Sequence, residues 1–112
     1  MALTKQAEDL IIIDIGRLSS IADYLFVCSG TSDRQVQAVS RYILDELEKE
    51  GIRPLGTEGV DEGRWALLDY GDIVVHIFLD PVREYYDLEG LWADAPRVDL
   101  GELLEMEKGR GV

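Results

Sequence analysis

The sequence has few of the residues that bind metals or form disulfides. Its 112 residues include one histidine, His76, and one cysteine, Cys28. A single cysteine forms no disulfide within the chain, and a lone thiol in an apolar stretch is usually a small buried hydrophobic residue. Zinc sites usually take three or four protein ligands, so a single histidine does not indicate a metal site. We expect His76 to be hydrogen-bonded in the core or at an interface. We therefore expect no metal and no cofactor.

Long hydrophobic runs are also missing. The apolar segments are far shorter than the ~20 residues that a membrane-spanning helix requires. The start of the chain contains Lys5, Glu8 and Asp9 instead of the apolar stretch of a secretory signal. These absences predict a cytoplasmic protein that does not bind a membrane.

Basic residues are scarce. The chain has 11 Lys and Arg residues against 23 Asp and Glu residues, a formal net charge of -12, and no basic cluster. Nucleic-acid binding depends on neutralising phosphates, so we expect no direct binding of RNA or DNA. An acidic protein is instead attracted to basic protein partners. The alternative is that the charge only maintains solubility.

Length and composition favour a single domain. A chain of 112 residues that is 46% hydrophobic is sufficient for one compact core. We expect this domain to occupy residues 1–98. Residues 99–112 are expected to form a short amphipathic and partly disordered tail.

The order of apolar patterns predicts an α/β fold of the α+β type. Two continuous apolar segments, at residues 10–15 and 24–28, predict buried strands. The first of them is rich in β-branched residues. Helical spacing, with Ser32 as cap and Gly51 as stop, predicts a helix over residues 33–50. The other expected elements are a short strand at 52–57, a mobile acidic loop at 58–63, strands at 65–69 and 72–79, and a helix capped by Asp80. Antiparallel links and one strand-helix-strand crossover predict a mixed sheet of about five strands with packed helices.

The two strands at 65–69 and 72–79 predict a hairpin with an unusual face. If Tyr70 and Gly71 form the whole loop, Asp69 lies opposite Asp72, and Trp65 lies opposite His76. Alternation then gives one face of ordinary core residues and one face that mixes an indole, an imidazole and carboxylates with aliphatic side chains. Such a mixture is typical of a surface that binds a protein partner.

We extend this surface into the helix that follows, in which Pro81, Tyr85, Leu88 and Trp92 form a stripe at helical spacing. For Arg83 three possibilities remain open: a solvated side chain, an ion pair with Asp80 or Glu84, or a contact with the partner. The predicted partner-binding residues are Trp65, Leu67, Asp69, Asp72, Val74, His76, Arg83, Tyr85 and Tyr86. Trp65 is expected to be the energetic centre. The alternative is that Trp65 is a core residue and that the two carboxylates only stabilise the turn.

A catalytic alternative rests on Gly30, Thr31 and Ser32, at a strand-to-helix junction where free backbone amides can hold a phosphate. Nucleotidyltransferases follow such a loop with two carboxylates on a strand that hold divalent cations. Here Asp69 and Asp72 instead lie on either side of a turn. We therefore favour helix capping by Ser32 and predict a protein that is not an enzyme.

Several blocks of the sequence together resemble a known family. They are ADY at 22–24, SGTSDRQV at 29–36, PLGTEG at 54–59, Trp65, LDYGDIVVHIF at 68–78, Arg83, Tyr86, Leu88 with Glu89, and LWADA at 91–95. In order and spacing they are similar to the bacterial ribosomal silencing factor family, also called Iojap-like.

The resemblance implies a fold like that of nucleotidyltransferases and a function without catalysis. It implies a translational repressor that binds the large ribosomal subunit through its universal protein numbered fourteen. This would sterically block association with the small subunit and lower translation under nutrient limitation. It also implies a homodimer. The alternatives are a nucleotide-binding protein or enzyme that uses residues 30–32, and a scaffold for ribosome assembly.

Overall fold

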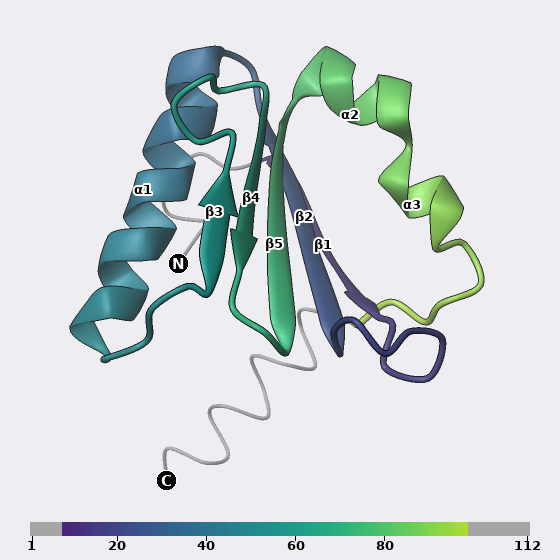
Figure 1. Ribbon diagram of the computed structural model, residues 1–112. Helices are drawn as coiled ribbons and strands as arrows, with labels where there is room; N and C mark the ends of the chain where they lie inside the picture. Colours follow the sequence, from purple (N-terminus) through teal and green to yellow (C-terminus); the bar gives the residue numbers. More distant parts are fainter. Residues whose placement is uncertain (1–7, 99–112) are drawn as a thin grey trace, which may run out of the picture.

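The computed structural model, which describes residues 8–98, contains one mixed sheet with helices on both of its faces (Figure 1). The tail expected over residues 99–112 lies outside the described residues. In chain order the elements are β1 Glu8–Asp14, β2 Tyr24–Gly30, α1 Asp33–Lys49, β3 Gly56–Glu58, β4 Trp65–Asp69, β5 Ile73–Leu79, α2 Asp80–Tyr86 and α3 Leu88–Leu91. The predicted α+β class and the five-stranded mixed sheet are confirmed.

The sheet has the order β1-β2-β5-β4-β3. Strands β2 and β5 are parallel, and every other neighbouring pair is antiparallel. The outer edge of β1 is partly covered by a later segment, because Val98 N donates to Ile12 O at 2.8 Å and Asp14 N donates to Pro96 O at 2.9 Å. Since β2 and β5 run in the same direction, residue 30 and the start of α2 lie at the same end of the sheet.

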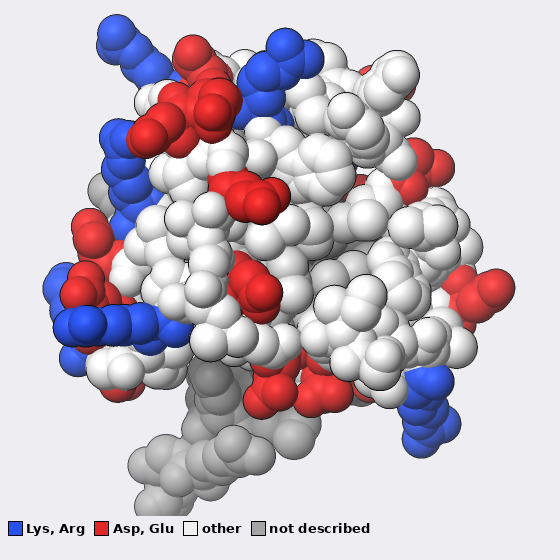
Figure 2. All heavy atoms as spheres, viewed as in Figure 1, with Lys and Arg blue, Asp and Glu red and all other residues white. Residues whose placement is uncertain are grey.

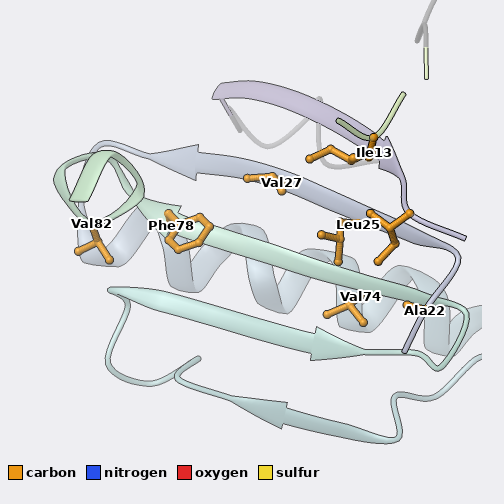
Figure 3. Packing of buried hydrophobic residues seen from close by; sticks show 9 residues of the cluster. Ile13, Ala22, Leu25, Val27, Val74, Phe78 and Val82 are labelled. Atoms are coloured by element: carbon orange, nitrogen blue, oxygen red, sulfur yellow. The ribbon is translucent and has the colours of Figure 1, made fainter. Parts of the chain in front are cut away.

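Each face of the sheet packs its own hydrophobic cluster, as strand alternation requires. On the α1 side the buried residues are Cys28, Val36, Val39, Ile43, Ala66, Leu68, Val75 and Ile77. On the α2 side they are Ile13, Ile15, Ala22, Leu25, Val27, Val74, Phe78, Val82 and Ala95, most of which are labelled in Figure 3. The predicted assignment of hairpin residues to two faces is therefore confirmed.

Helix α1 forms as its sequence predicts. The Ser32 hydroxyl accepts a hydrogen bond from Gln35 N at 3.1 Å, which satisfies one of the free amides of the first turn. At the other end Gly51 has a φ of 79°, and Ile52 N donates to Leu47 O at 2.8 Å. This is the closing bond of a Schellman motif, in which glycine adopts the left-handed conformation at no steric cost.

The connection from α1 to β4 differs from the prediction. The strand expected at residues 52–57 is only the three-residue β3, Gly56–Glu58, at the edge of the sheet. The acidic segment that follows is fastened to α1, because Gln37 Nε2 donates to Asp61 O at 2.6 Å and Arg41 pairs with the Asp61 carboxylate at 3.0 Å. Gly63 lies directly against the backbone of Asp33.

The predicted hairpin register is wrong. The structure pairs Trp65 with Phe78, Leu67 with His76, and Asp69 with Val74. Tyr70 N donates to Ile73 O at 2.9 Å, so the two loop residues are Gly71 and Asp72, with a φ of 87° at Gly71. The Asp69 carboxylate also accepts from Gly71 N at 2.8 Å, which favours this turn over one centred on Tyr70 and Gly71. The register differs from the prediction by two residues, an even number, so the composition of each face does not change.

The helix after β5 also differs from the prediction. Leu79 occupies the cap position and Asp80 already belongs to the first turn, where its charge suits the helix dipole. The helix ends at Asp87, whose left-handed conformation (φ 47°) separates α2 from α3. The predicted stripe of Pro81, Tyr85, Leu88 and Trp92 therefore does not form one buried face. Leu88 and Trp92 pack against the core cluster, whereas Tyr85 is 82% exposed.

Candidate partner-binding site

The candidate site lies where the start of β4, the end of β5 and α2 meet. The Trp65 ring packs on Phe78, which pairs with it across the strands, with ring centroids 4.9 Å apart. The ring also packs against Tyr86 of α2, with centroids 4.8 Å apart. Tyr85 packs edge-on against Tyr86 at 5.1 Å. We call Trp65, Tyr85 and Tyr86 the aromatic cluster.

The polar edge of Trp65 is held inside the domain. Its indole Nε1 donates to His76 Nδ1 at 3.0 Å, which places the imidazole proton on Nε2. His76 is buried, and this burial lowers its pKa to about 4, so the ring is neutral near pH 7. Trp65 itself is half-buried. The sequence prediction of a hydrogen-bonded strand histidine is confirmed, and that histidine orients the indole.

The exposed part of the cluster borders a shallow hollow of about 310 Å³, lined by Arg64, Pro81, Val82, Tyr85 and Tyr86. Tyr85 is 82% exposed and Tyr86 55% exposed. Apolar surface of this kind, with polar groups at its margin, is typical of a site that receives side chains of a partner protein.

The predicted partner-binding residues divide by burial. Val74 and His76 lie in the core, and Trp65, Leu67 and Asp69 are half-buried along β4. The exposed predicted residues are Asp72, Tyr85 and Tyr86. The structure thus brings Trp65, Tyr85 and Tyr86 together, whereas Asp69 and Asp72 lie at the hairpin turn, at the opposite end of β4.

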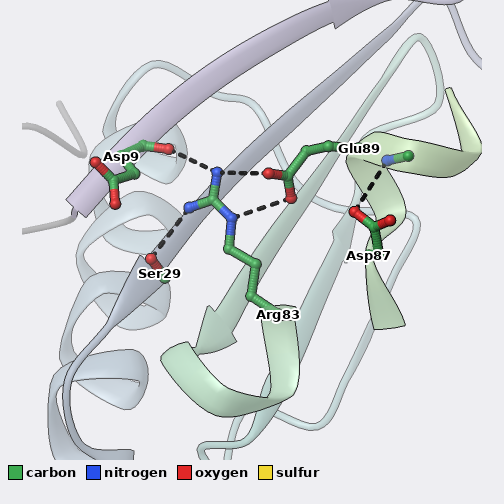
Figure 4. Close-up of polar contacts among 6 residues, drawn as sticks. Asp9, Ser29, Arg83, Asp87 and Glu89 are labelled. Carbon is green, nitrogen blue, oxygen red and sulfur yellow. Dashed lines mark hydrogen bonds and ion pairs between the residues drawn. The ribbon is translucent and has the colours of Figure 1, made fainter. Parts of the chain in front are cut away.

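Arg83 is engaged within the domain (Figure 4). Its guanidinium donates to both carboxylate oxygens of Glu89, to Ser29 Oγ and to the carbonyl oxygen of Asp9. Neither of the ion-pair partners considered from the sequence, Asp80 and Glu84, is used. Glu89 lies six residues away, and the turn at Asp87 brings it back toward α2.

The glycine-serine loop is occupied by its own hydrogen bonds. Thr31 N donates to Gln35 Oε1 at 2.6 Å, and Ser32 Oγ accepts from Gln35 N. The neighbouring Cys28 is fully buried, and this burial raises the pKa of its thiol to about 11. Within residues 8–98 no group of three or more His, Cys, Asp or Glu side chains is arranged to hold a metal ion.

The charges around the site are uneven. Figure 2, drawn from the same side as Figure 1, shows a mostly uncharged surface between α1 and the α2–α3 segment. Acidic groups are scattered over it, and Lys and Arg side chains gather at its margins.

Among the helices of residues 8–98, none combines the length and the apolar character that a membrane span requires.

Comparison with known sequences decides the family. The family described as "Ribosomal silencing factor during starvation" matches residues 1–111. The chain belongs to this family. It is 50% identical over 96 residues to Ribosomal silencing factor RsfS of Bacillus subtilis, covering 86% of this chain and 81% of that protein. It is 32% identical over 91 residues to the Mus musculus protein named "Mitochondrial assembly of ribosomal large subunit protein 1", covering 79% of this chain and 40% of that one.

Solved structures agree with this family assignment. A crystal structure of a Chromobacterium violaceum protein has a TM-score of 0.80 and 38% identity, covering 82% of this chain and 77% of that chain. A Bacillus halodurans protein has a TM-score of 0.78 and 36% identity, covering 88% and 90%. The sequence resemblance to ribosomal silencing factors is confirmed.

Sequence reasoning missed several residues at this site. Arg64 lines the hollow but is not among the predicted partner-binding residues, and Pro81, named only in the helical stripe, lines it too. Arg64 directly precedes the candidate tryptophan, so its position was a usable signal. Glu89 had no such signal, because a spacing of six residues is not a contact spacing on a continuous helix.

Proposed function

We propose that the protein is a translational repressor that binds the large ribosomal subunit through the universal large-subunit protein numbered fourteen. Binding there would sterically block the small subunit and lower translation under nutrient limitation. Membership of a family of ribosomal silencing factors supports the repressor role. We further propose that the protein acts in the cytoplasm and without catalysis.

The observation that carries the proposal is the aromatic cluster. Tyr85 and Tyr86 are exposed beside a hollow, and Trp65 of strand β4 packs against Tyr86. Aromatic residues in such a setting commonly supply most of the binding energy of a protein interface. His76 holds the Trp65 indole through its hydrogen bond, Leu67 continues the surface along β4, and Val74 lies in the core near the hairpin turn.

Net charge favours a basic partner. A chain with a formal charge of -12 is repelled by bare ribosomal RNA and attracted to a basic ribosomal protein. Asp69 and Asp72 at the turn would lie at the rim of the interface, where carboxylates mainly raise the association rate. The electrostatics therefore favour a basic ribosomal protein over bare ribosomal RNA as the partner.

Direct binding tests the proposal. Purified protein, immobilised on a sensor surface, is exposed in turn to large subunits, small subunits and isolated protein fourteen. We expect saturable binding of large subunits and of protein fourteen, and none of small subunits. Binding of large subunits without any binding of isolated protein fourteen would reject that partner, and no binding of large subunits would reject the function.

A second candidate function is a scaffold for assembly of the large subunit, which the name of the mouse relative favours. Such a protein would use the same surface but would leave subunit joining unchanged. Cells that lack such a scaffold would instead accumulate incomplete large subunits. Sedimentation profiles of cells that lack the protein separate these two functions.

We also propose a homodimer in solution, as the family resemblance implies. Light scattering at tens of micromolar measures this directly. A mass of one chain would mean that the exposed apolar residues serve the ribosomal partner alone.

A further inference from the structure

The segment that carries Tyr85 and Tyr86 has little to hold it in place by itself. Helix α2 spans seven residues and buries only Val82, and α3 spans four residues and buries none fully. Isolated helices of this length are unstable in water, so their geometry depends on tertiary contacts. The two helices also meet at Asp87, whose left-handed backbone costs free energy.

Besides the buried Val82 and the partly buried Leu88, Arg83 connects this segment to the rest of the domain. From α2 its guanidinium reaches three other elements, as Figure 4 shows: Glu89 of α3 at 3.0 Å, Ser29 of β2 at 3.1 Å and the Asp9 carbonyl of β1 at 2.9 Å. The fork geometry of arginine permits these bonds at once, which a lysine ammonium does not reproduce.

The ion pair of Arg83 with Glu89 is poorly placed to contact a partner, because little of either side chain is exposed. The Arg83 side chain is 11% exposed and the Glu89 side chain 24% exposed. Of the five N–H donors of the guanidinium, four bond to the Glu89 carboxylate, Ser29 Oγ and the Asp9 carbonyl oxygen. A partner that binds this mostly buried guanidinium directly would compete with these internal bonds.

We propose that Arg83 and Glu89 form a positioning pair that holds Tyr85 and Tyr86 beside Trp65 before the partner arrives. Arg83 lies three residues before Tyr86 on α2, one helical turn away. Fixing Arg83 to β1, β2 and α3 therefore fixes the direction in which the tyrosines project. Arg83 is thereby assigned to organising the surface and not to contacting the partner. This inference rests on the proposed ribosome binding.

Preorganisation of this kind has a kinetic signature. If only a fraction of the molecules holds the binding geometry, apparent affinity falls by that fraction. The loss appears mainly as slower association, because fewer molecules are competent at each encounter. A direct contact, once removed, mainly accelerates dissociation.

The test uses Arg83→Met, Glu89→Gln and the double variant, with binding to purified large subunits and amide hydrogen exchange as readouts. We expect each single variant to lower affinity about tenfold through association, and to increase exchange in residues 80–91. Arg83→Met also removes the bonds to Ser29 and Asp9, so its loss should be at least as large as that of Glu89→Gln, and the double variant should be no worse than Arg83→Met. Arg41→Met is the matched control, because it removes an exposed ion pair of the same 3.0 Å length, with Asp61.

The outcomes separate the hypotheses. If Glu89→Gln binds like the wild type while Arg83→Met is impaired, Glu89 does not position the tyrosines and the inference is overturned. Unchanged exchange in residues 80–91 of Glu89→Gln also overturns it, even if Arg83→Met fails to fold. If the wild type itself does not bind large subunits, the proposed function fails and this inference fails with it.

Discussion

At the scale of single residues, Tyr85 and Trp65 differ in how much of each side chain is exposed to solvent. Both belong to the aromatic cluster, but Trp65 also packs on Phe78 and donates to His76. Truncating Trp65 therefore removes support from the core as well as any contact with a partner. Tyr85 touches Tyr86 and is otherwise 82% exposed, so it reports on binding alone.

Tyr85→Ala should weaken binding to the large subunit without unfolding the domain. We expect an affinity loss of about thirty-fold, ~2 kcal/mol, because exposed aromatic anchors become fully desolvated in an interface. The free energy of unfolding should change by less than ~0.5 kcal/mol, as for most surface substitutions. Binding kinetics and urea unfolding measure the two effects.

The matched control for Tyr85→Ala is Ile21→Ala. Ile21 is 80% exposed in the connection between β1 and β2, at the end of the sheet away from α2. Its truncation should change neither stability nor affinity. Equal losses of affinity in both variants would mean that binding is not localised to the aromatic cluster.

His76 should make stability depend on pH. Burial lowers its folded-state pKa from 6.5 to about 4, so between these values the unfolded chain binds more protons than the folded one. The contribution of neutral His76 to the free energy of unfolding is complete above pH 6.5 and is lost as pH falls toward 4. The shift corresponds to ~3 kcal/mol at most.

Unfolding of the wild type and of His76→Gln, measured from about pH 7 to about pH 4, checks this. Glutamine does not titrate, and its amide oxygen can still accept the Trp65 bond. We expect the stability difference between the two proteins to shrink by ~3 kcal/mol across the range. A constant difference would show that His76 titrates at an ordinary pKa in the folded state.

At the scale of elements, the packing of the segment after β3 against α1 depends on a glycine. Gly63 has a φ of 72°, and a Cβ there would lie 2.5 Å from the Asp33 carbonyl oxygen. Gly51 has a similar φ of 79° but open space around it. The two positions share the backbone conformation and differ only in their surroundings.

Gly63→Ala should therefore destabilise the domain more than Gly51→Ala. We expect ~1 kcal/mol at Gly51 from the left-handed backbone alone, and more than ~2 kcal/mol at Gly63, where the added carbon also meets backbone. Chemical unfolding of both variants measures the difference. Equal costs would argue that the loop moves away from α1 without penalty.

The elements also show how far sequence reasoning reaches. Local signals predicted α1 with its serine cap, the strands and their two faces, because each depends on neighbouring residues. The hairpin register and the break at Asp87 depend on small differences between competing turns, which periodicity does not resolve. The burial of Val74 and His76 depends on α2 and α3 covering that face, which is a tertiary effect.

At the scale of the whole molecule, the acidic charge should govern how fast the partner is found. Asp69→Asn combined with Asp72→Asn removes two charges from the hairpin turn, and the amide oxygen introduced at position 69 can still accept from Gly71 N. We expect slower association at low salt, with little change in dissociation. Between about 0.05 M and about 0.3 M salt, the association rates of the variant and the wild type should converge as screening increases.

Stopped-flow or surface-binding kinetics across that salt series measure the effect. Faster dissociation of the double variant at every salt concentration would place the two carboxylates inside the interface. An unchanged association rate at low salt would mean that the charge of the chain serves solubility alone.

The central claim is that the protein keeps the ribosomal subunits apart by occupying the large one. Its most direct test is sedimentation of equal amounts of purified small and large subunits with increasing protein, under conditions in which the subunits otherwise join. We expect the peak of joined ribosomes to be replaced by separate subunits, with the protein in the large-subunit peak, and Tyr85→Ala to require about thirty-fold more protein. An undiminished peak of joined ribosomes, with the wild-type protein bound to large subunits, would contradict the account.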